Sequence, residues 1–265
     1  MKHLLSLLLL AALFACQPAE PELIEKEISY GTGDVSMNGY LVYDNSIDEK
    51  RPGVLVVHEW WGHNPYARER ARKLAKLGYV ALAVDMYGNG KQAGHPEDAG
   101  KFAGEVMKNM NEAQARFEAA LNILKNFDKT NSEKTAAIGY CFGGGVVLQM
   151  ARMGVDLDGV VSFHGSIASQ MPAEKGKVKA ELLVLNGADD GFVTKDQIDA
   201  FKAEMDSADV EYKFINYQGA KHSFTNPDAD SLGAEFNLPL AYDKTADEKS
   251  WNEMKNFFTK IFEKR

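Results

Sequence analysis

The chain has 265 residues, of which 45% are hydrophobic and 10% aromatic, and its formal net charge is −8. This apolar content is too high for an intrinsically disordered chain. The acidic balance argues against a nucleic-acid partner, because such partners require a basic surface facing the phosphates. The two cysteines exclude a disulfide-dense scaffold. No Cys/His cluster has the spacing of a metal site, and we expect neither a metal nor a cofactor.

Residues 1–15 form a short basic start followed by a nearly unbroken apolar run. As a helix this run would span about 18 Å, well short of the roughly 30 Å hydrocarbon core of a bilayer. It therefore predicts a signal peptide rather than a transmembrane helix. The run ends in Leu13-Phe14-Ala15-Cys16, which resembles a bacterial lipobox with Cys16 as the lipidated residue. Plain secretory cleavage and an uncleaved hydrophobic tail are the alternatives.

Residues 16–29 are predicted to form a lipidated, proline-bearing tether, and residues 30–265 a globular domain. We expect an exported protein held by a lipid anchor at a bacterial membrane surface. Because Gln17 rather than Asp follows Cys16, the periplasmic face of the outer membrane is the expected location in a Gram-negative host. If Cys16 is lipidated, Cys141 has no intramolecular disulfide partner. The sequence does not predict an oligomeric state.

Strand patterns and helix patterns alternate along the rest of the chain. Strands are predicted at residues 24–30, 35–43, 53–58, 79–85, 134–140, 159–164, 181–186 and 210–216, and helices at 65–77, 101–108, 112–127, 143–153, 195–206 and 246–263. The first two strands are expected to pair antiparallel at a sheet edge. The regular alternation predicts an α/β fold, with a mostly parallel sheet and helices on both faces. An active site would then lie beyond the carboxyl ends of the strands.

Cys141 lies between a predicted strand and a predicted helix, with Gly139 and Gly143 two positions away on either side. A sharp strand-to-helix turn needs small residues at these positions so that the backbones can approach each other. Such a turn lifts the thiol above the sheet and directs the positive end of the helix dipole toward it. Cys141 is therefore a candidate nucleophile. The alternative is a buried, unreactive cysteine in a tight connection.

A nucleophile in this kind of turn needs a base and an orienting acid, which follow it in the order acid, then histidine. His222 is the histidine that follows an acid at a later strand end. The spacing from Gly187 to Val193 favours Asp190 as the acid, while Asp189 stays open as an alternative that otherwise caps the turn. A solvated loop histidine is the alternative interpretation of His222.

Residues 58–62 follow the first buried strand, where proteins with such a turn supply the second amide of an oxyanion hole. The backbone N–H groups of Trp60 and Phe142 are the predicted pair. Glu59 is costly to bury beside tryptophan unless it has a partner, and a solvent-facing carboxylate is the alternative. Residues expected to line the substrate pocket are Trp61, Tyr87, Asn89, His164 and Phe224.

Together these residues resemble the dienelactone hydrolase family, cysteine-dependent members of the α/β-hydrolase fold, over about residues 30–263. The motifs that carry the resemblance are residues 58–62, 85–88, 139–144, 190–193 and 222–224. It implies an α/β-hydrolase fold and a triad of Cys141, His222 and Asp190. It also implies that Glu59 is the partner of the thiol in the resting enzyme. The implied reaction is hydrolysis of a small carboxylic ester or lactone through a thioacyl intermediate.

The chain departs from the family pattern at two positions. Family members that act on dienelactone hold its carboxylate with two arginines, and this chain has Asn226 at one of these places and about Asn89 at the other. The named substrate is therefore not carried over. A thioesterase or a general carboxylesterase on the same fold is one alternative. A non-catalytic, ligand-binding lipoprotein with a redox-sensing thiol is another.

Overall fold

The computed structural model describes residues 20–33, 35–169 and 171–264. The predicted signal peptide and Cys16 lie outside this part of the chain. The strands are β1 Leu23–Thr32, β2 Val35–Asp44, β3 Arg51–Val57, β4 Val80–Val84, β5 Thr130–Tyr140, β6 Gly159–Phe163, β7 Glu181–Gly187 and β8 Tyr212–Tyr217. The helices are α1 Pro65–Ala75, α2 Pro96–Lys108, α3 Met110–Asn126, α4 Phe142–Arg152, α5 Lys195–Ser207, α6 Ala229–Phe236 and α7 Lys244–Glu263. Among these helices, none has both the length and the apolar character needed to cross a membrane.

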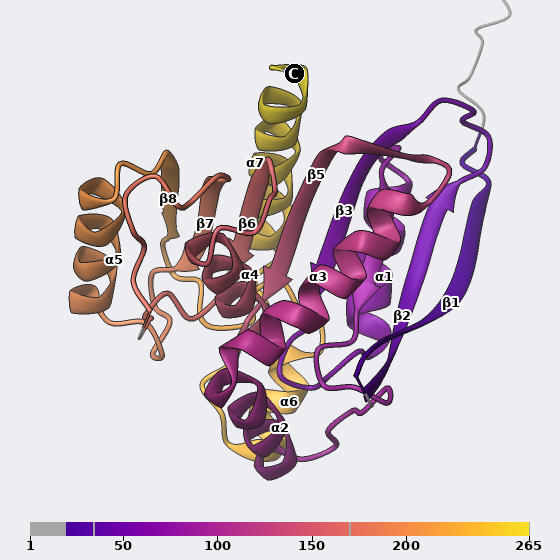
Figure 1. Cartoon of the computed structure of the whole chain (residues 1–265). Helices are drawn as coiled ribbons and strands as arrows, with labels where there is room; N and C mark the ends of the chain where they lie inside the picture. The colour runs from indigo at the N-terminus through magenta and orange to yellow at the C-terminus, as the bar shows by residue number, and fades with distance from the viewer. Residues whose placement is uncertain (1–19, 34, 170, 265) are drawn as a thin grey trace, which may run out of the picture.

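The strands form one sheet in the order β1-β2-β4-β3-β5-β6-β7-β8 (Figure 1). β1 pairs antiparallel with β2, and β2 pairs antiparallel with β4. The pairs from β4 through β3 and β5 to β8 are all parallel. The predicted α/β-hydrolase fold, with a mostly parallel sheet and an antiparallel ribbon at its edge, is therefore confirmed.

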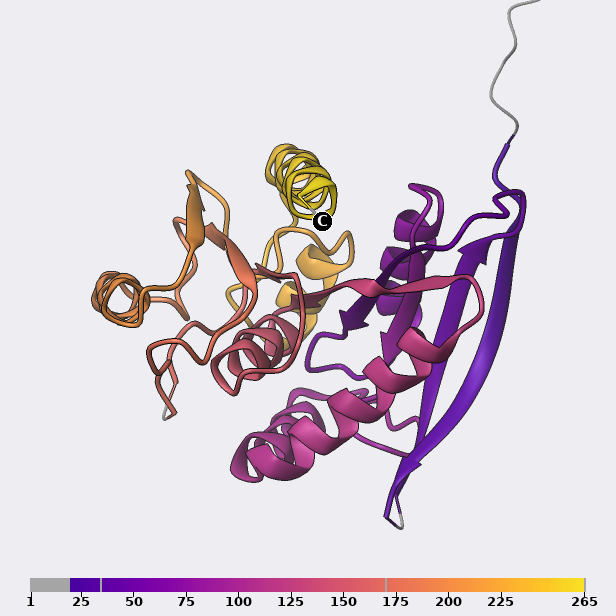
Figure 2. The same cartoon turned by 45° about the horizontal axis from the view of Figure 1, so that its top comes forward.

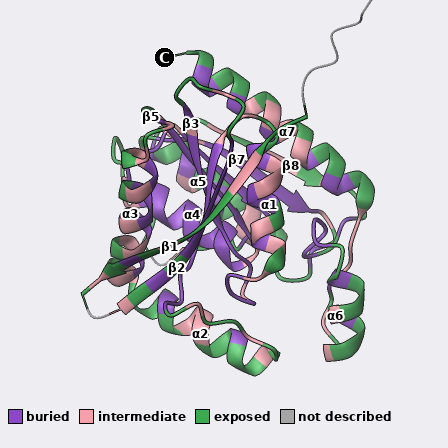
Figure 3. Cartoon of the chain, turned by 90° about the vertical axis from the view of Figure 1, so that its right-hand side faces the viewer, coloured by how far each residue is buried: buried purple, intermediate pink, exposed green. Residues whose placement is uncertain are grey.

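Helices cover both faces of the sheet, with α1 and α7 on one side and α3 and α4 on the other (Figure 2). Leu55 and Val57 of β3 belong to the core beneath α3 and α4, whereas Val54 and Val56 belong to the core beneath α1 and α7. Successive side chains of a strand point to opposite faces, so β3 has to be apolar at nearly every position. β4 and β6 are accordingly buried along their whole length, and β5 is buried from Thr135 onward (Figure 3).

Two helices differ from the sequence-based expectation. α2 begins at Pro96, five residues before the predicted start at 101, because His95 caps its N-terminus and proline fits the first helical position. α6 falls in a segment for which no element was expected. It is short and contains Gly233, so neither its length nor its composition gives a clear helix pattern.

Candidate active site

Cys141 occupies the turn between β5 and α4 in a strained backbone conformation, with φ at 53°. A Cβ atom on Gly139 would lie 2.1 Å from the Gly143 oxygen, and one on Gly143 would lie 2.4 Å from the Val57 oxygen. Real Cβ atoms do not approach backbone this closely, so both positions require glycine. The predicted sharp turn is present, and it places the thiol at the N-terminus of α4 beyond the carboxyl end of β5.

The amides of Cys141 and Phe142 differ in the hydrogen bonds that the fold gives them. The Cys141 N–H donates to the Phe163 carbonyl at 3.0 Å and to His164 Nδ1 at 3.2 Å. Phe142 is the first residue of α4, and the N–H groups of a first helical turn have no intrahelical acceptor. Phe142 and Trp60, the predicted oxyanion pair, line the same cavity as Cys141.

The structure brings Cys141, His222 and Asp190 into one hydrogen-bonded row. His222 Nε2 lies 3.1 Å from Cys141 Sγ, and His222 Nδ1 lies 2.8 Å from Asp190 Oδ2. The other oxygen of Asp190 accepts the Phe192 N–H at 2.8 Å, which fixes the carboxylate. Asp189, the alternative acid, is exposed and does not make this contact. These distances are within the range for a nucleophile, a base and an orienting acid.

The environment of His222 favours its protonated form. Burial acts to lower the pKa of the imidazole, but the electrostatic attraction of the adjacent Cys141 sulfur and the hydrogen bond to Asp190 outweigh it and raise the pKa to about 10. A protonated ring carries a hydrogen on both nitrogens and can donate to the sulfur and to the carboxylate at the same time. At neutral pH His222 is therefore protonated and can donate to both Cys141 Sγ and Asp190 Oδ2.

Glu59 is buried, with 1% of its surface exposed, and its partners differ from the expected one. Its carboxyl oxygens accept hydrogen bonds from Ser223 Oγ at 3.0 Å and Asn226 Nδ2 at 2.7 Å. Burial raises the pKa of Glu59, while these two bonds act in the opposite direction. The resting contact between Glu59 and the thiol that the resemblance implies is not made in this structure, where the thiol contacts His222 instead.

His164 lies behind the Cys141 turn rather than in front of it. Because His164 Nδ1 accepts the Cys141 N–H, the ring hydrogen must be on Nε2, which donates to Thr225 Oγ1 at 2.7 Å. Burial holds the pKa of His164 well below its usual range, so the ring is neutral. Thr225 Oγ1 also lies 2.5 Å from the Tyr66 hydroxyl. Sequence reasoning missed Thr225 and Tyr66, because the contact joins segments that are distant in the chain.

A buried ion pair between α1 and α7 contacts the segment that contains Thr225. Arg70 Nη2 lies 2.9 Å from Asp247 Oδ1 and also donates to the Thr225 carbonyl oxygen. Arg70 and Asp247 are both buried, and a buried charge is costly unless it is paired. The segment from His222 to Thr225 is thus attached to α1 and α7 as well as to the Cys141 turn.

A cavity of about 260 Å³ opens in front of the thiol. The residues that line it are Trp60, Ala103, Cys141, Phe142, Ser166, Phe192, Val193, His222, Leu238 and Leu240. Several of these were not expected from the sequence. A detectable signal was the pair Leu238 and Leu240 around a proline in an otherwise polar segment. Phe192 and Val193 were detectable by their proximity in sequence to Asp190.

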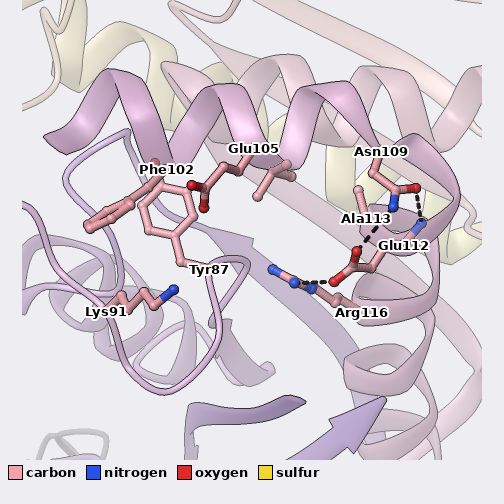
Figure 4. Close-up of a pocket in the computed structure, with 9 residues that line it drawn as sticks. Tyr87, Lys91, Phe102, Glu105, Asn109, Glu112, Ala113 and Arg116 are labelled. Atoms are coloured by element: carbon pink, nitrogen blue, oxygen red, sulfur yellow. Dashed lines mark hydrogen bonds and ion pairs between the residues drawn. The ribbon is translucent and has the colours of Figure 1, made fainter. Parts of the chain in front are cut away.

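The structure places the five expected pocket residues outside this lining. Tyr87 lies in the wall of a second cavity of about 190 Å³ between α2, α3 and the segment after β4 (Figure 4). Its hydroxyl donates to the Trp60 carbonyl at 2.8 Å, so Tyr87 helps to position Trp60, which lines the cavity in front of Cys141. In the same figure, Arg116 contacts Glu112 across one turn of α3.

The other expected pocket residues also support the site from outside the cavity or lie elsewhere. Trp61 is buried against Trp60 and Phe236. Phe224 is fully buried and packs edge-on against His164. Asn89 lines a polar hollow beside β1 and β2, away from the thiol.

Comparison with known proteins agrees with this geometry. The sequence model of the dienelactone hydrolase family matches residues 37–262. A putative carboxymethylenebutenolidase of Aquifex aeolicus is 32% identical over 213 residues, which are 78% of this chain and 87% of the relative. A solved structure from metagenomic libraries, described as a dienelactone hydrolase-like promiscuous phosphotriesterase, is 35% identical with a TM-score of 0.85. That alignment covers 90% of this chain and 98% of the other.

The fold and these matches define the chain as an α/β hydrolase. It belongs to the dienelactone hydrolase family.

Proposed function

We propose that the protein hydrolyses carboxylic esters or lactones with Cys141 as the nucleophile, His222 as the acid and base, and Asp190 as the orienting acid. The observation that carries this proposal is the row of contacts from Cys141 Sγ to His222 Nε2 at 3.1 Å and from His222 Nδ1 to Asp190 Oδ2 at 2.8 Å. Membership of a hydrolase family supports it.

In the first step, the Cys141 thiolate attacks the carbonyl carbon of the ester and forms a C–S bond. The carbonyl oxygen becomes an oxyanion, which the N–H groups of Trp60 and Phe142 stabilise. The C–O bond to the alcohol then breaks, and the leaving oxygen takes the proton from His222 Nε2. The products of this step are the free alcohol, a thioester on Cys141 and a neutral His222. In a lactone the alcohol stays attached to the acyl group.

In the second step, His222 acts as a base toward water. Once the sulfur is acylated, the negative charge that raised the pKa of His222 is gone, so the neutral ring can accept a proton near neutral pH. Water attacks the thioester carbon, its proton passes to His222 Nε2, and the C–S bond breaks. The carboxylic acid is released, and the thiolate and imidazolium are restored.

Kinetics with two variants test this proposal. Cys141→Ala is expected to remove hydrolysis of p-nitrophenyl acetate while leaving the circular dichroism spectrum unchanged. Asp190→Asn is expected to lower kcat by orders of magnitude, because the ring loses its orienting carboxylate. Rapid alkylation of the wild-type thiol by iodoacetamide near pH 7 should remove activity in proportion. Turnover that survives in Cys141→Ala would contradict the proposal, and a chain with no esterase activity would favour a redox-sensing or ligand-binding role.

The solved relative described as a promiscuous phosphotriesterase favours a second candidate activity. A phosphotriester is uncharged, and the apolar walls of the cavity before Cys141 suit an uncharged ligand. We propose that the same site hydrolyses phosphotriesters as a minor activity. Paraoxon, p-nitrophenyl acetate and an acyl thioester are assayed side by side with the wild type and with Cys141→Ala. Comparing the three rates separates this activity from those of a carboxylesterase and a thioesterase, and each rate should depend on Cys141.

We also propose that the protein is exported and anchored by a lipid on Cys16. The lipobox-like run that ends in Cys16 supports this location. Expression of the full chain in a bacterial host with labelled palmitate is the test. Label in the wild type but not in Cys16→Ser is the expected result, and an unlabelled protein in the wash supernatant would favour plain secretion.

A further inference from the structure

The walls of the cavity before Cys141 are mainly apolar, and they come from segments that are distant in the sequence. Trp60 follows β3, Ala103 belongs to α2, and Phe192 and Val193 follow β7. Phe192 is 51% exposed, and its ring stands edge-on to the ring of His222 with centroids 4.9 Å apart. An exposed aromatic residue at the mouth of an apolar cavity continues the apolar surface outward.

The wall that follows α6 is attached directly to the catalytic loop. Leu240 forms a β-bridge with His222, and the Ala241 N–H donates to the His222 carbonyl at 3.2 Å. Asn237, the residue that follows α6, adopts the left-handed conformation, and the Leu238 N–H then donates to the Gly233 carbonyl at 3.0 Å. These bonds tie the backbone that carries Leu238 and Leu240 to the backbone of His222 and to α6.

This lining does not stabilise a negatively charged substrate group. Burying a carboxylate against leucine and phenylalanine removes its hydration without replacing the lost hydrogen bonds. Asn226 stands at a position where the family resemblance implies a carboxylate-binding arginine. Its side-chain amide already donates a hydrogen bond to Glu59 at 2.7 Å. Asn89 faces a different hollow, where Arg68 is paired with Glu27. By contrast, a methylene group placed against Leu238 or Leu240 gains free energy through the hydrophobic effect.

We propose that the substrates of this site are uncharged esters with an apolar acyl group of a few carbons, and that Leu238 and Leu240 set this specificity. The inference rests on the function proposed above and adds the chemical class of the substrate. The cavity volume of about 260 Å³ accommodates a short aliphatic chain or a single ring. Each methylene group buried there should raise kcat/KM by up to about fourfold until the cavity is filled.

A matched pair of substrates tests the inference on the wild-type protein. p-Nitrophenyl hemisuccinate carries a carboxylate, and its neutral methyl ester has the same acyl chain and the same leaving group. We expect kcat/KM to be at least about 100-fold higher for the neutral member, and to rise from p-nitrophenyl acetate to butyrate. Equal or faster turnover of the hemisuccinate would overturn the inference. Cys141-dependent turnover of p-nitrophenyl acetate would still stand in that case, so failure of the inference and failure of the proposed function give different results.

A charge placed in the wall tests the role of Leu238. Leu238→Lys should raise the ratio of kcat/KM for the hemisuccinate to that for its methyl ester by about tenfold or more, because a cation then faces the acyl group. Ala234→Lys is the matched control, since Ala234 is exposed on α6 outside the lining, and the ratio should stay unchanged. Leu238→Ala should instead flatten the acetate-to-butyrate increase. If neither Leu238 variant changes these ratios, the assignment of specificity to this wall is wrong.

Discussion

Asn226 Nδ2 lies 2.7 Å from Glu59 Oε2, and this bond joins the loop that carries His222 to the segment that carries Trp60. A neutral amide thus holds the buried carboxyl group at a place where the family resemblance implies an arginine. Burial is the largest influence on Glu59 and raises its pKa, while the bonds from Asn226 and Ser223 and the charges of His222 and Arg70 act in the opposite direction. The site therefore holds Glu59 with two donors, Asn226 and Ser223.

Removing the Asn226 donor should destabilise the protein. In Asn226→Leu the buried Glu59 loses one of its two hydrogen bonds, and the free energy of unfolding should fall by about 1–3 kcal/mol. Urea denaturation followed by circular dichroism measures the change. Asn122→Leu is the control, since Asn122 is exposed on α3, and it should shift the free energy by less than about 0.5 kcal/mol. An unchanged midpoint for Asn226→Leu would show that the bond to Glu59 contributes nothing.

The hydroxyl of Thr225 should matter for catalysis although it lies behind the nucleophile. In Thr225→Val the His164 Nε2–H loses its acceptor, so the tautomer that accepts the Cys141 N–H is no longer favoured. We expect kcat for p-nitrophenyl acetate to fall about tenfold or more, with a smaller change in KM. Thr225→Ser keeps the hydroxyl and should restore most of kcat. Equal losses of kcat in both variants would indicate that kcat depends on the methyl group of Thr225 and not on its hydrogen bond.

The pKa of His222 should depend on the thiol. In the resting protein the pKa is about 10, so the ring stays protonated from pH 6 to 9 and loses its proton as the pH rises through about 10. kcat/KM should decline over the same upper range, because the leaving group loses its proton donor. In Cys141→Ala the attraction of the sulfur is absent while burial still lowers the pKa, so the midpoint should fall. Titration of ¹⁵N-labelled histidine by NMR measures both midpoints, and identical values would contradict the attraction between the sulfur and the imidazole ring on which the proposed mechanism depends.

Glycine at position 139 should be indispensable. A Cβ atom there would lie 2.1 Å from the Gly143 carbonyl oxygen, and the backbone on both sides is buried, so Gly139→Ala should cost more than about 3 kcal/mol. Gly100→Ala provides the comparison, because a Cβ on this exposed residue of α2 meets nothing within 4 Å. That variant should gain up to about 1 kcal/mol, since alanine favours helix. Thermal unfolding of both variants decides the matter.

The sequence was most informative where local geometry restricts the residue type. Gly139 and Gly143 are required by close backbone approach, and β3 is apolar at successive positions because it is buried on both faces. Such constraints are visible in a short window of sequence. They were sufficient to predict the fold, the strand-to-helix turn and the order of the elements that bring Cys141, Asp190 and His222 together.

Contacts between distant segments were not predictable in the same way. Leu238 and Leu240 follow a short helix without a clear pattern, and their position depends on the bridge to His222. His164 was expected to line the substrate pocket, but its positive φ of 39° and its bond to the Cys141 N–H place the ring behind the thiol. Glu59 was expected at the thiol, and the donors that hold it elsewhere, Ser223 and Asn226, come from the far end of the chain.

A covalent acyl group on Cys141 is the most direct sign of the proposed chemistry. p-Nitrophenyl pivalate, whose bulky acyl group slows hydrolysis of a thioester, is mixed with the wild-type protein, quenched in acid within a second and analysed by mass spectrometry. A pivaloyl adduct on the peptide that contains Cys141, formed together with one equivalent of p-nitrophenol and lost on longer incubation, is the expected result. An unmodified Cys141 peptide during steady turnover, with the same rate in Cys141→Ala, would contradict it.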